Sequence, residues 1–234
     1  MSRVALFQEF IQIAGIIDRE EAQLLIDCGV EYLGFPLRLP VHKEDLSEAE
    51  SSKIIRSLTP PHQGVVITYL EDAGEITEFM DLLGARIVQL HGDIGLAQLS
   101  RLKGLKPDFE IVKSLVVGKY EDAELVAMIK KLGPWVEAFI IDTFDRETGA
   151  CGATGKTHDW DVSRKLVELT DRPVILAGGL TPENVGEAIL KVKPAGVDSH
   201  TGVEDASGRK VRNKVERFIS EAKAAFASLR REDV

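Results

Sequence analysis

The chain has 234 residues, of which 44% are hydrophobic and 29% are charged, and its formal net charge is -9. A net negative surface disfavours nucleic-acid and anionic-membrane partners, because both select basic patches. No apolar run approaches the ~18 residues of a membrane span, and the first residues do not resemble a signal peptide. The two cysteines, Cys28 and Cys151, have neither metal-ligand nor disulfide spacing. We therefore expect a cytoplasmic protein without a metal or cofactor, and protein partners stay open.

Eight short apolar segments rich in β-branched residues alternate with amphipathic helical segments along the chain. The predicted strands begin at Ile11 (IQIAG), Tyr32 (YLGF), Gly64 (GVVITY), Arg86 (RIVQLH), Glu110 (EIVKSLVV), Ala138 (AFIIDT), Pro173 (PVILAGG) and Gly196 (GVDSHTG). Eight strand–helix units in a chain of this length predict an α/β fold, a single (β/α)8 TIM barrel over residues 1–234. Residues 1–9 would lead into the barrel and residues 230–234 would form a tail. The main rival, a doubly wound open sheet, usually has fewer strands, and the first turn lacks a GxGxxG fingerprint.

Capping residues mark the predicted helix starts. Three pairs place an acceptor at the start and a carboxylate three residues on: Asp18 with Glu21, Ser47 with Glu50 and Asn213 with Glu216. A capping hydroxyl, Thr181, also precedes a first-turn proline. Helical spacing of apolar residues predicts buried faces at Ile76, Phe79, Met80 and Leu83, and at Val215, Phe218, Ile219, Ala222 and Phe226.

The last two predicted strands end in glycine and hydroxyl residues, in the segments AGGLTPEN and SHTGVED. Barrels frequently bind phosphate with the loops after these strands, where backbone N–H groups and a helix N-terminus hold the anion. The pattern favours a phosphate site that includes Gly178, Gly179, Thr201 and Gly202. The alternative is that the glycines only form tight turns.

Other polar residues gather at predicted strand ends, where barrels build their active sites. They are His91, Asp93, Asp142, Asp198 and His200. The run FII before Asp142 indicates a carboxyl group that leaves a buried strand, where desolvation raises the pKa and suits the group to general acid catalysis. The alternative is a carboxylate that caps the loop or pairs with a lysine such as Lys156.

Lys113, in the segment IVKSL, has two interpretations. It forms a Schiff base in an aldolase-like site, or it is a buried cation paired with a neighbouring carboxylate. We favour the pairing, because nothing local marks this lysine as nucleophilic. The histidines and aspartates at the strand ends lack local metal-ligand spacing, so the sequence predicts no metal site.

Five motifs follow one another along the chain: VQLHGD at 88–93, IIDT at 140–143, GATGKTHDW at 152–160, LAGGLTPENV at 176–185 and GVDSHTGVE at 196–204. Together they resemble the phosphoribosylanthranilate isomerase family, and the resemblance runs from about Ile11 to the last helix. Members of this family are (β/α)8 enzymes that perform an Amadori rearrangement in tryptophan biosynthesis. The resemblance implies a phosphorylated sugar as the small-molecule substrate.

The family reaction needs an acid and a base. An aspartate protonates the ribose ring oxygen, and a cysteine near the start of the chain removes the C2′ proton, which gives an enolamine that tautomerises to the ketone. The aspartate matches Asp142. The cysteine belongs to a Lys-Ile-Cys-Gly motif, which here is QIAG at 12–15, so Ala14 stands at the position of the base. The resemblance also places four further residues in substrate binding: Gln89, His91, Gly155 and Asp198.

Other departures from the family pattern are expected on the same face of the barrel as Ala14. The second loop of the family carries Ser-x-Arg near the substrate carboxylate, and the corresponding stretch here is VHKED. Lys43 lies near the arginine position, with Arg38 as a rival, although lysine lacks the bidentate fork of arginine. The paired serines of strand eight are replaced by His200 and Thr201, and the aromatic residue of the strand-six motif by His158.

Three hypotheses explain this pattern. The first is a family isomerase whose base has moved to His200, His158 or Cys151, and histidine suits the task because its ordinary pKa lies near neutral pH. The second is an enzyme that keeps the phosphate site and Asp142 but acts on another phosphorylated sugar or sugar-amine. The third is a catalytically silent barrel that binds a phosphorylated metabolite or a protein partner.

Overall fold

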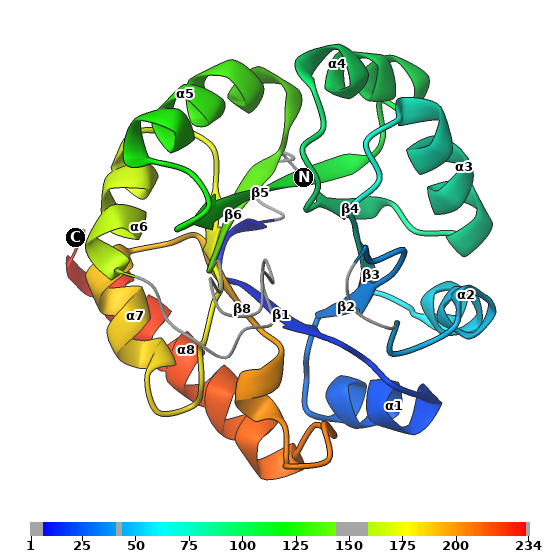
Figure 1. Cartoon of the computed structure of the whole chain (residues 1–234). Coiled ribbons are helices and arrows are strands. Elements are labelled where there is room, and N and C mark those ends of the chain that lie inside the picture. The colour runs from blue at the N-terminus through cyan, green and yellow to red at the C-terminus, as the bar shows by residue number, and fades with distance from the viewer. Residues whose placement is uncertain (1–6, 41–43, 144–158, 233–234) are drawn as a thin grey trace.

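The computed structural model describes residues 7–40, 44–143 and 159–232. Eight parallel strands close into a barrel in chain order, with β1 pairing both β2 and β8 (Figure 1). The strands are β1 (Phe10–Ala14), β2 (Tyr32–Pro36), β3 (Gln63–Thr68), β4 (Ile87–Leu90), β5 (Glu110–Val117), β6 (Ala138–Thr143), β7 (Val174–Leu176) and β8 (Gly196–Ser199). This topology confirms the predicted (β/α)8 fold class.

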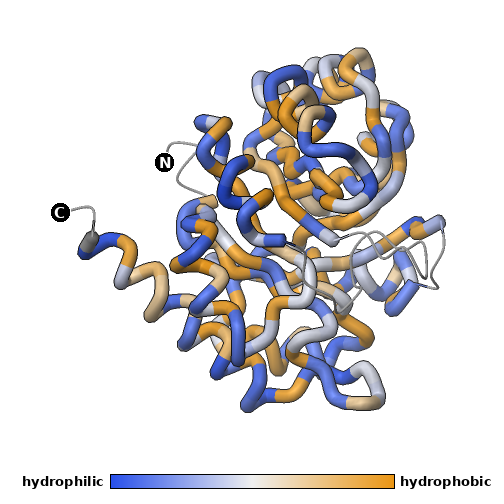
Figure 2. The backbone as a smooth tube through the Cα atoms, turned by 60° about the vertical axis from the view of Figure 1, so that its left-hand side comes forward, coloured by the Kyte–Doolittle hydropathy of each residue, from blue (hydrophilic) through white to orange (hydrophobic). Residues whose placement is uncertain are grey.

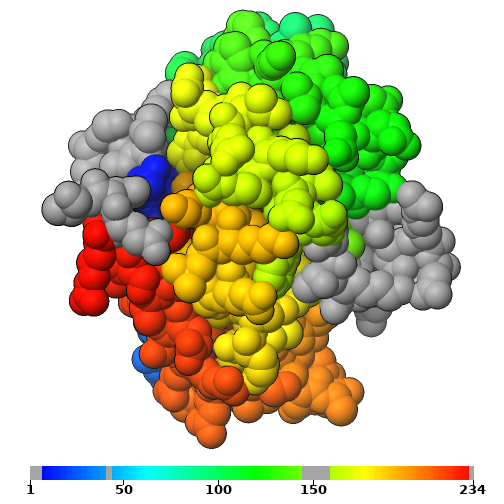
Figure 3. All heavy atoms as spheres, turned by 90° about the vertical axis from the view of Figure 1, so that its left-hand side faces the viewer, coloured from blue at the N-terminus to red at the C-terminus, as the bar shows by residue number. Residues whose placement is uncertain are grey.

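Helices follow the strands and form the outer ring of the barrel (Figure 1). The α-helices are α1 (Arg19–Asp27), α2 (Glu48–Ser57), α3 (Ala73–Leu83), α4 (Leu96–Leu105), α5 (Asp122–Leu132), α6 (Trp160–Glu168), α7 (Val185–Val192) and α8 (Arg212–Glu232). Two short 3₁₀ helices, η2 (Gly133–Trp135) and η3 (Thr201–Val203), complete the described elements. Figure 3 shows α6, α7 and α8 packed side by side over one face.

Most of the predicted caps are present. The carboxylate of Asp18 accepts a hydrogen bond from the amide of Glu21 (2.8 Å), and the hydroxyl of Ser47 accepts one from the amide of Glu50 (3.3 Å). The hydroxyl of Thr181 accepts a bond from the Glu183 amide (3.2 Å) in the turn that leads into α7.

The predicted cap at Asn213 is wrong. Helix α8 begins at Arg212, and the amides of Lys214 and Val215 both donate to the carbonyl of Val211. Asn213 therefore lies inside the first turn, where its side chain cannot act as the first acceptor of the helix.

Two apolar layers hold the fold together. The larger layer lies between the strands and the helices and contains the predicted faces of α3 and α8. Figure 2 shows how hydrophilic and hydrophobic residues alternate along α8, as expected for a helix with one buried face. The smaller layer fills the barrel itself, where the rings of Phe7 and Phe10 lie 5.4 Å apart and those of Phe10 and Tyr32 4.0 Å apart. In the described ranges, no helix is long and apolar enough to cross a membrane.

The interior of the barrel changes from apolar to polar along the strands. Side chains two residues apart share a face of a strand, so the apolar interior positions of β1, β5 and β6 are followed by polar ones. The buried polar residues of this upper layer are Gln12, Gln89, His91, Ser114, Asp142 and Asp198. The fold thus gathers polar groups from separate strands at the carboxyl end of the barrel, as the sequence predicts.

We predict that Gly196→Ala weakens the closure of the barrel. A Cβ at this position would stand 2.6 Å from both the Cβ and the carbonyl oxygen of Phe10, across the β1–β8 seam. We expect a loss of about 1–3 kcal/mol in the free energy of unfolding, because backbone must move to relieve the contact. Denaturant unfolding measures it.

The matched control is Gly104→Ala in α4, where a new Cβ would meet nothing within 4 Å. An alanine there should stabilise the helix by about 0.5–1 kcal/mol. Equal stability of the Gly196→Ala variant and the wild type would show that the seam tolerates a methyl group.

Candidate active site

The strand register brings two aspartates to the same level of the barrel. Ile141 pairs with Leu176, and Leu176 pairs with Val197. One residue further along, Asp142 on β6 and Asp198 on β8 flank Ala177 of the intervening chain, whose amide continues the ladder by donating to the Ile141 carbonyl (2.8 Å). Only a methyl group therefore projects between the two carboxyl-bearing strands.

Asp142 is a buried carboxyl group with one hydrogen-bond donor among the described residues. Its Oδ1 accepts a hydrogen bond from the Thr143 amide (2.7 Å), and its Oδ2 lies 4.0 Å from Nε2 of His91. Burial raises the pKa of Asp142 to about 6, and the Thr143 amide offsets part of this rise. A carboxyl group in this state holds a proton at slightly acid pH and can donate it.

Asp198 is a second buried carboxyl group in this layer. Its Oδ1 has no hydrogen-bond partner in the described part of the chain. Burial, followed by the charge of Asp142, raises the pKa of Asp198 to about 7, while a hydrogen bond from Gln12 and the charge of Lys210 act in the opposite direction. Gln12 pairs with Asp198 in the β1–β8 register and also donates to Oε1 of Gln89 (3.2 Å).

His91 directly follows β4, which lies across the barrel from β8. Its Nδ1 is 2.6 Å from the hydroxyl of Ser114, and its ring meets that of Tyr69 edge-on with centroids 5.0 Å apart. The structure thus brings His91, Gln89, Asp142 and Asp198 together, as the sequence predicts.

His200 lies over the end of β1. If Gly15 carried a Cβ, that atom would stand 1.9 Å from Nε2 of His200, so the imidazole occupies the space beside this glycine. The same nitrogen lies 3.4 Å from Oε1 of Glu204 and 4.0 Å from Oδ2 of Asp45. Ala14 ends β1 directly before Gly15. An imidazole therefore lies at the end of β1, beside the residue that follows Ala14.

A buried ion pair fixes this corner of the site. The ammonium of Lys210 donates to the carbonyl of Gly15 (2.9 Å) and to Oε1 of Glu204 (2.5 Å), the same oxygen that faces His200. Glu21 accepts bonds from the amides of Lys210 (2.8 Å) and Ile17 (3.1 Å). Burial raises the pKa of Glu204, and the charge of Lys210 opposes that rise.

Sequence reasoning misses this ion pair. Glu204 is part of the last family motif, but Lys210 lies in a polar loop with no recognisable pattern. Only the folded chain places its ammonium against the end of β1.

The two predicted phosphate loops lie against each other. The hydroxyl of Ser199 donates to the carbonyl of Leu180 (2.8 Å), and a Cβ on Gly202 would stand 1.9 Å from that same carbonyl oxygen. Gly178 and Gly179 have φ values of 86° and 64°, in the left-handed region that favours glycine. Their amides donate to no acceptor in the described ranges. Two backbone donors at this edge of the barrel fit an anionic ligand, with Thr201 at the start of η3 beside them.

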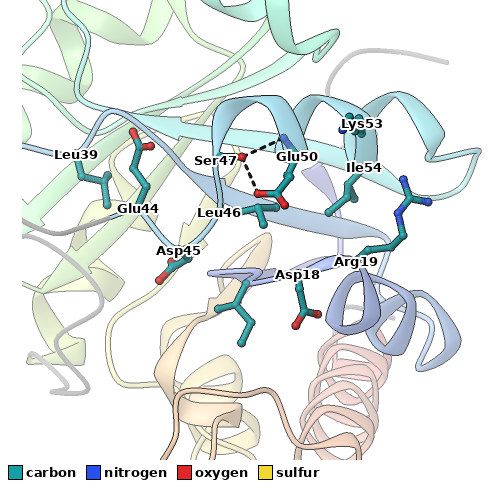
Figure 4. Close-up of a pocket in the computed structure, with 11 residues that line it drawn as sticks. Asp18, Arg19, Leu39, Glu44, Asp45, Leu46, Ser47, Glu50, Lys53 and Ile54 are labelled. Carbon is teal, nitrogen blue, oxygen red and sulfur yellow. Dashed lines mark hydrogen bonds between the residues drawn. The ribbon is translucent and has the colours of Figure 1, made fainter.

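A pocket of about 820 Å³ opens between the loops that follow β1 and β2 (Figure 4). It carries several carboxylates, among them Asp18, Glu44, Asp45 and Glu50, together with Arg19 and Lys53. Asp45 lines this pocket, and its Oδ2 also lies 4.0 Å from Nε2 of His200. The side of the site next to the β2–α2 loop is therefore rich in negative charge.

Arg38 takes no part in that pocket. Its guanidinium pairs with Glu48 at 2.8 Å and lies over the ring of Phe79, 3.8 Å from the centroid. The sequence offers Arg38 as the alternative to Lys43 for binding a substrate carboxylate. In the structure its guanidinium is held between α2 and α3 instead. Lys43 itself lies outside the described residues, as do Cys151, Gly155, Lys156 and His158.

Two other candidates lie away from the barrel interior. Lys113 alternates with Val112 and Ser114 along β5, so its side chain leaves the opposite face of the strand, and its ammonium donates to the Ser114 carbonyl (2.8 Å). Asp93 accepts bonds from Lys119 (2.9 Å) and Tyr120 (2.5 Å) at the rim. Within the described ranges, no three or more His, Cys, Asp and Glu side chains are grouped to hold a metal.

A family model described as N-(5'phosphoribosyl)anthranilate (PRA) isomerase matches residues 11–221. The chain belongs to this family. It is 38% identical over 222 residues to N-(5'-phosphoribosyl)anthranilate isomerase 2 of Methanosarcina mazei, which covers 94% of this chain and 96% of that protein.

Solved structures of the phosphoribosylanthranilate isomerase family have the same fold. The enzyme from Thermotoga maritima superposes with a TM-score of 0.77 at 25% identity and covers 92% of this chain and 98% of that one. A phosphoribosyl anthranilate isomerase in complex with reduced 1-(o-carboxyphenylamino)-1-deoxyribulose 5-phosphate gives a TM-score of 0.74 at 23% identity, with the same coverage.

We predict that Lys210→Met destabilises the protein by about 3 kcal/mol, because the buried carboxylate of Glu204 loses its cation. The second change Glu204→Gln should recover at least about 1 kcal/mol of that loss, since it removes the unpaired charge. Denaturant unfolding of the single and double variants measures both values.

The control is Lys191→Met, which breaks an exposed pair with Asp161 (3.0 Å). Its effect should stay within about 0.5 kcal/mol. If both lysine variants have the same small effect, the Lys210–Glu204 pair does not hold this corner of the site.

Proposed function

We propose that this protein isomerises N-(5'-phosphoribosyl)anthranilate to its 1-deoxyribulose product, the Amadori step of tryptophan biosynthesis. Membership of the family supports the reaction class. The observation that carries the proposal is Asp142, a buried carboxyl group at the end of β6 with a pKa of about 6. It stands where the family motif has its general acid. We place the reaction in the cytoplasm with other steps of amino-acid biosynthesis.

Asp142 begins the reaction by giving its proton to the oxygen of the furanose ring. The C1′–O bond breaks as the nitrogen lone pair forms an iminium ion, and Asp142 is left as a carboxylate. A base then removes the C2′ proton, and the electron pair of that C–H bond neutralises the iminium to give the enolamine. Tautomerisation transfers the proton held by the base to C1′ and returns the proton of the C2′ hydroxyl to Asp142, so the protons balance and both groups are regenerated.

We assign the base to His200. Its imidazole lies beside Gly15 at the end of β1, and two carboxylates face its Nε2. These carboxylates favour the imidazolium that forms when His200 accepts the C2′ proton. The carboxyl groups of Glu204 and Asp45 would thus support proton abstraction at the end of β1.

The phosphate of the substrate would lie at the loops that follow β7 and β8. The amides of Gly178 and Gly179, with Thr201 and Gly202 on the next loop, supply donors that need no basic side chain.

A second candidate substrate is another phosphorylated sugar-amine. The carboxylates of Glu44 and Asp45 in the pocket beside β1 favour it, because they repel the carboxylate of an anthranilate ring. The test compares kcat/KM for N-(5'-phosphoribosyl)anthranilate with that for phosphoribosyl amines whose aryl or alkyl group is neutral. A higher kcat/KM for the neutral substrates would indicate that the natural substrate carries a neutral amine in place of anthranilate.

We predict that Asp142→Asn lowers kcat by about 10²–10⁴-fold, because the amide cannot donate a proton to the ring oxygen. The rate of turnover of N-(5'-phosphoribosyl)anthranilate measures this loss. Asp81→Asn, which changes an exposed aspartate paired with Lys106, is the control and should leave kcat unchanged. Turnover by Asp142→Asn at the wild-type rate would remove Asp142 from the mechanism.

We predict that His200→Ala lowers kcat by about 10²–10⁴-fold through loss of the base. Adding Ala14→Cys to this variant should raise kcat at least about tenfold, because a thiolate then stands at the end of β1. The same assay measures both variants. If His200→Ala keeps full activity, another group takes the C2′ proton.

A further inference from the structure

Three neighbouring strands, β4, β5 and β6, bring a histidine, a serine and an aspartate together in the upper layer of the barrel. Gln89 pairs with Val112 across β4 and β5. Two residues further along both strands, His91 and Ser114 therefore face the same lumen. Asp142 comes from the next strand, β6, and is also buried. The proposed reaction uses Asp142 as its acid and gives Ser114 no task.

The imidazole of His91 is held on two of its sides. Its Nδ1 lies 2.6 Å from the hydroxyl oxygen of Ser114, in a buried contact. The ring of Tyr69 meets the imidazole edge-on at an interplanar angle of 74°, with centroids 5.0 Å apart. These contacts fix the position and the plane of the imidazole, whose Nε2 faces the carboxyl group of Asp142.

The separation of His91 and Asp142 suits one shared ligand atom. Nε2 lies 4.0 Å from Oδ2, which is longer than a direct hydrogen bond. An oxygen atom about 2.8 Å from both atoms would lie roughly 2 Å off the line that joins them. Oδ1 of Asp142 accepts from the Thr143 amide, so Oδ2 is the oxygen that carries the acidic proton toward such an atom. One substrate oxygen can therefore accept from Nε2–H and from the carboxyl group at once.

This arrangement requires the hydrogen of a neutral imidazole to be on Nε2. A serine hydroxyl can donate to Nδ1 or accept from it, so it fits either tautomer. The position of Asp142 favours Nε2–H, because a lone pair on Nε2 would face the lone pairs of Oδ2, whereas an N–H is attracted to them. Nδ1 of His91 is then the acceptor, and the hydroxyl of Ser114 donates to it.

We propose that Ser114 is a positioning residue that holds His91 in its Nε2–H form, so that His91 and Asp142 act together on one oxygen of the substrate. The catalytic role rests on the proposed function, whereas the form of the imidazole does not. The oxygen is that of the furanose ring. As the C1′–O bond breaks, this oxygen takes the proton of Asp142 and keeps the electron pair of the bond, and Nε2–H donates a hydrogen bond to it. His91 keeps its own proton throughout, so the proton balance of the reaction is unchanged.

The first experiment records nitrogen NMR spectra of the histidine side chains in mildly alkaline buffer, where ordinary imidazoles are neutral, and needs no activity. His62 is an internal reference. Its Nδ1 lies 2.8 Å from the carbonyl oxygen of Val30, which only accepts, so its proton is on Nδ1. His91 should show the opposite form, with its proton on Nε2. The loss of signals in His62→Gln and His91→Gln assigns the two rings.

Ser114→Ala should lower the share of the Nε2–H form of His91, because a buried Nδ1 without a donor is costly. An unchanged share in this variant would contradict the proposal. A proton on Nδ1 of His91 in the wild type, or on both of its nitrogens, would overturn it, whether or not the protein is an isomerase.

The second experiment measures kcat and KM. Ser114→Ala should lower kcat about tenfold, less than the about 10²–10³-fold that follows the removal of a transition-state donor itself. KM should change by less than about twofold, because the interaction acts in the transition state. Ser114→Thr keeps the hydroxyl and should recover most of the loss. The control is Ser228→Ala, which removes an exposed hydroxyl bonded to the Ala224 carbonyl and should leave both constants unchanged. Equal kcat in Ser114→Ala and the wild type would remove Ser114 from the reaction.

A double-variant cycle tests whether Ser114 acts through His91. In His91→Gln no ring nitrogen faces the serine, so the further change Ser114→Ala should alter kcat by less than about twofold. If Ser114→Ala causes the same loss with His91 and with glutamine at that position, Ser114 acts by another route and the proposal fails.

The two kinds of measurement separate the possible failures. If His91 shows an Nε2–H form that depends on Ser114 while the wild type does not turn over the phosphoribosyl substrate, the proposed function fails and the positioning by Ser114 stands. If turnover is normal while His91 carries its proton on Nδ1, the proposed function stands and the positioning by Ser114 fails.

Discussion

The burial of two carboxyl groups inside a closed barrel is the constraint on which the candidate site depends. Closure fixes the register across β6, β7, β8 and β1, and this register alone sets Asp142, Ala177, Asp198 and Gln12 at one level. Desolvation then gives both aspartates raised pKa values, a property that neither would have on an open sheet edge.

The barrel buries polar side chains at its carboxyl end, and apolar packing elsewhere in the barrel stabilises the fold that holds them. The rings of Phe7, Phe10 and Tyr32 fill the lumen below the polar layer, and the helices bury a second apolar layer outside it. The end of β1 needs a further support, which the Lys210–Glu204 pair supplies by holding the carbonyl of Gly15. The same pair presents a carboxylate to His200, so stability and proposed chemistry share one set of contacts.

The end of β1 combines a small side chain with a neighbouring imidazole. Ala14 ends the strand, and the glycine after it lets the imidazole of His200 approach the strand end. The pocket on the β2–α2 side is lined by four carboxylates, with Arg19 and Lys53 as its basic residues. His200 directly precedes Thr201 and Gly202 in the chain, so the imidazole beside β1 and the predicted phosphate loop after β8 are neighbours at the barrel mouth.

The sequence by itself determines the barrel, because strand and helix periodicity and the order of the elements are local properties of the chain. It also determines which residues reach the carboxyl ends of the strands, as Asp142, Asp198, His91 and the paired glycines show. It could not indicate that Lys210 reaches the end of β1, that Arg38 is engaged by Glu48, or that the Asn213 cap fails. Each of these depends on contacts or on a helix boundary that no local pattern encodes. Only the tertiary structure decides the proton affinities of the two aspartates, because desolvation and the neighbouring charge arise when the strands close.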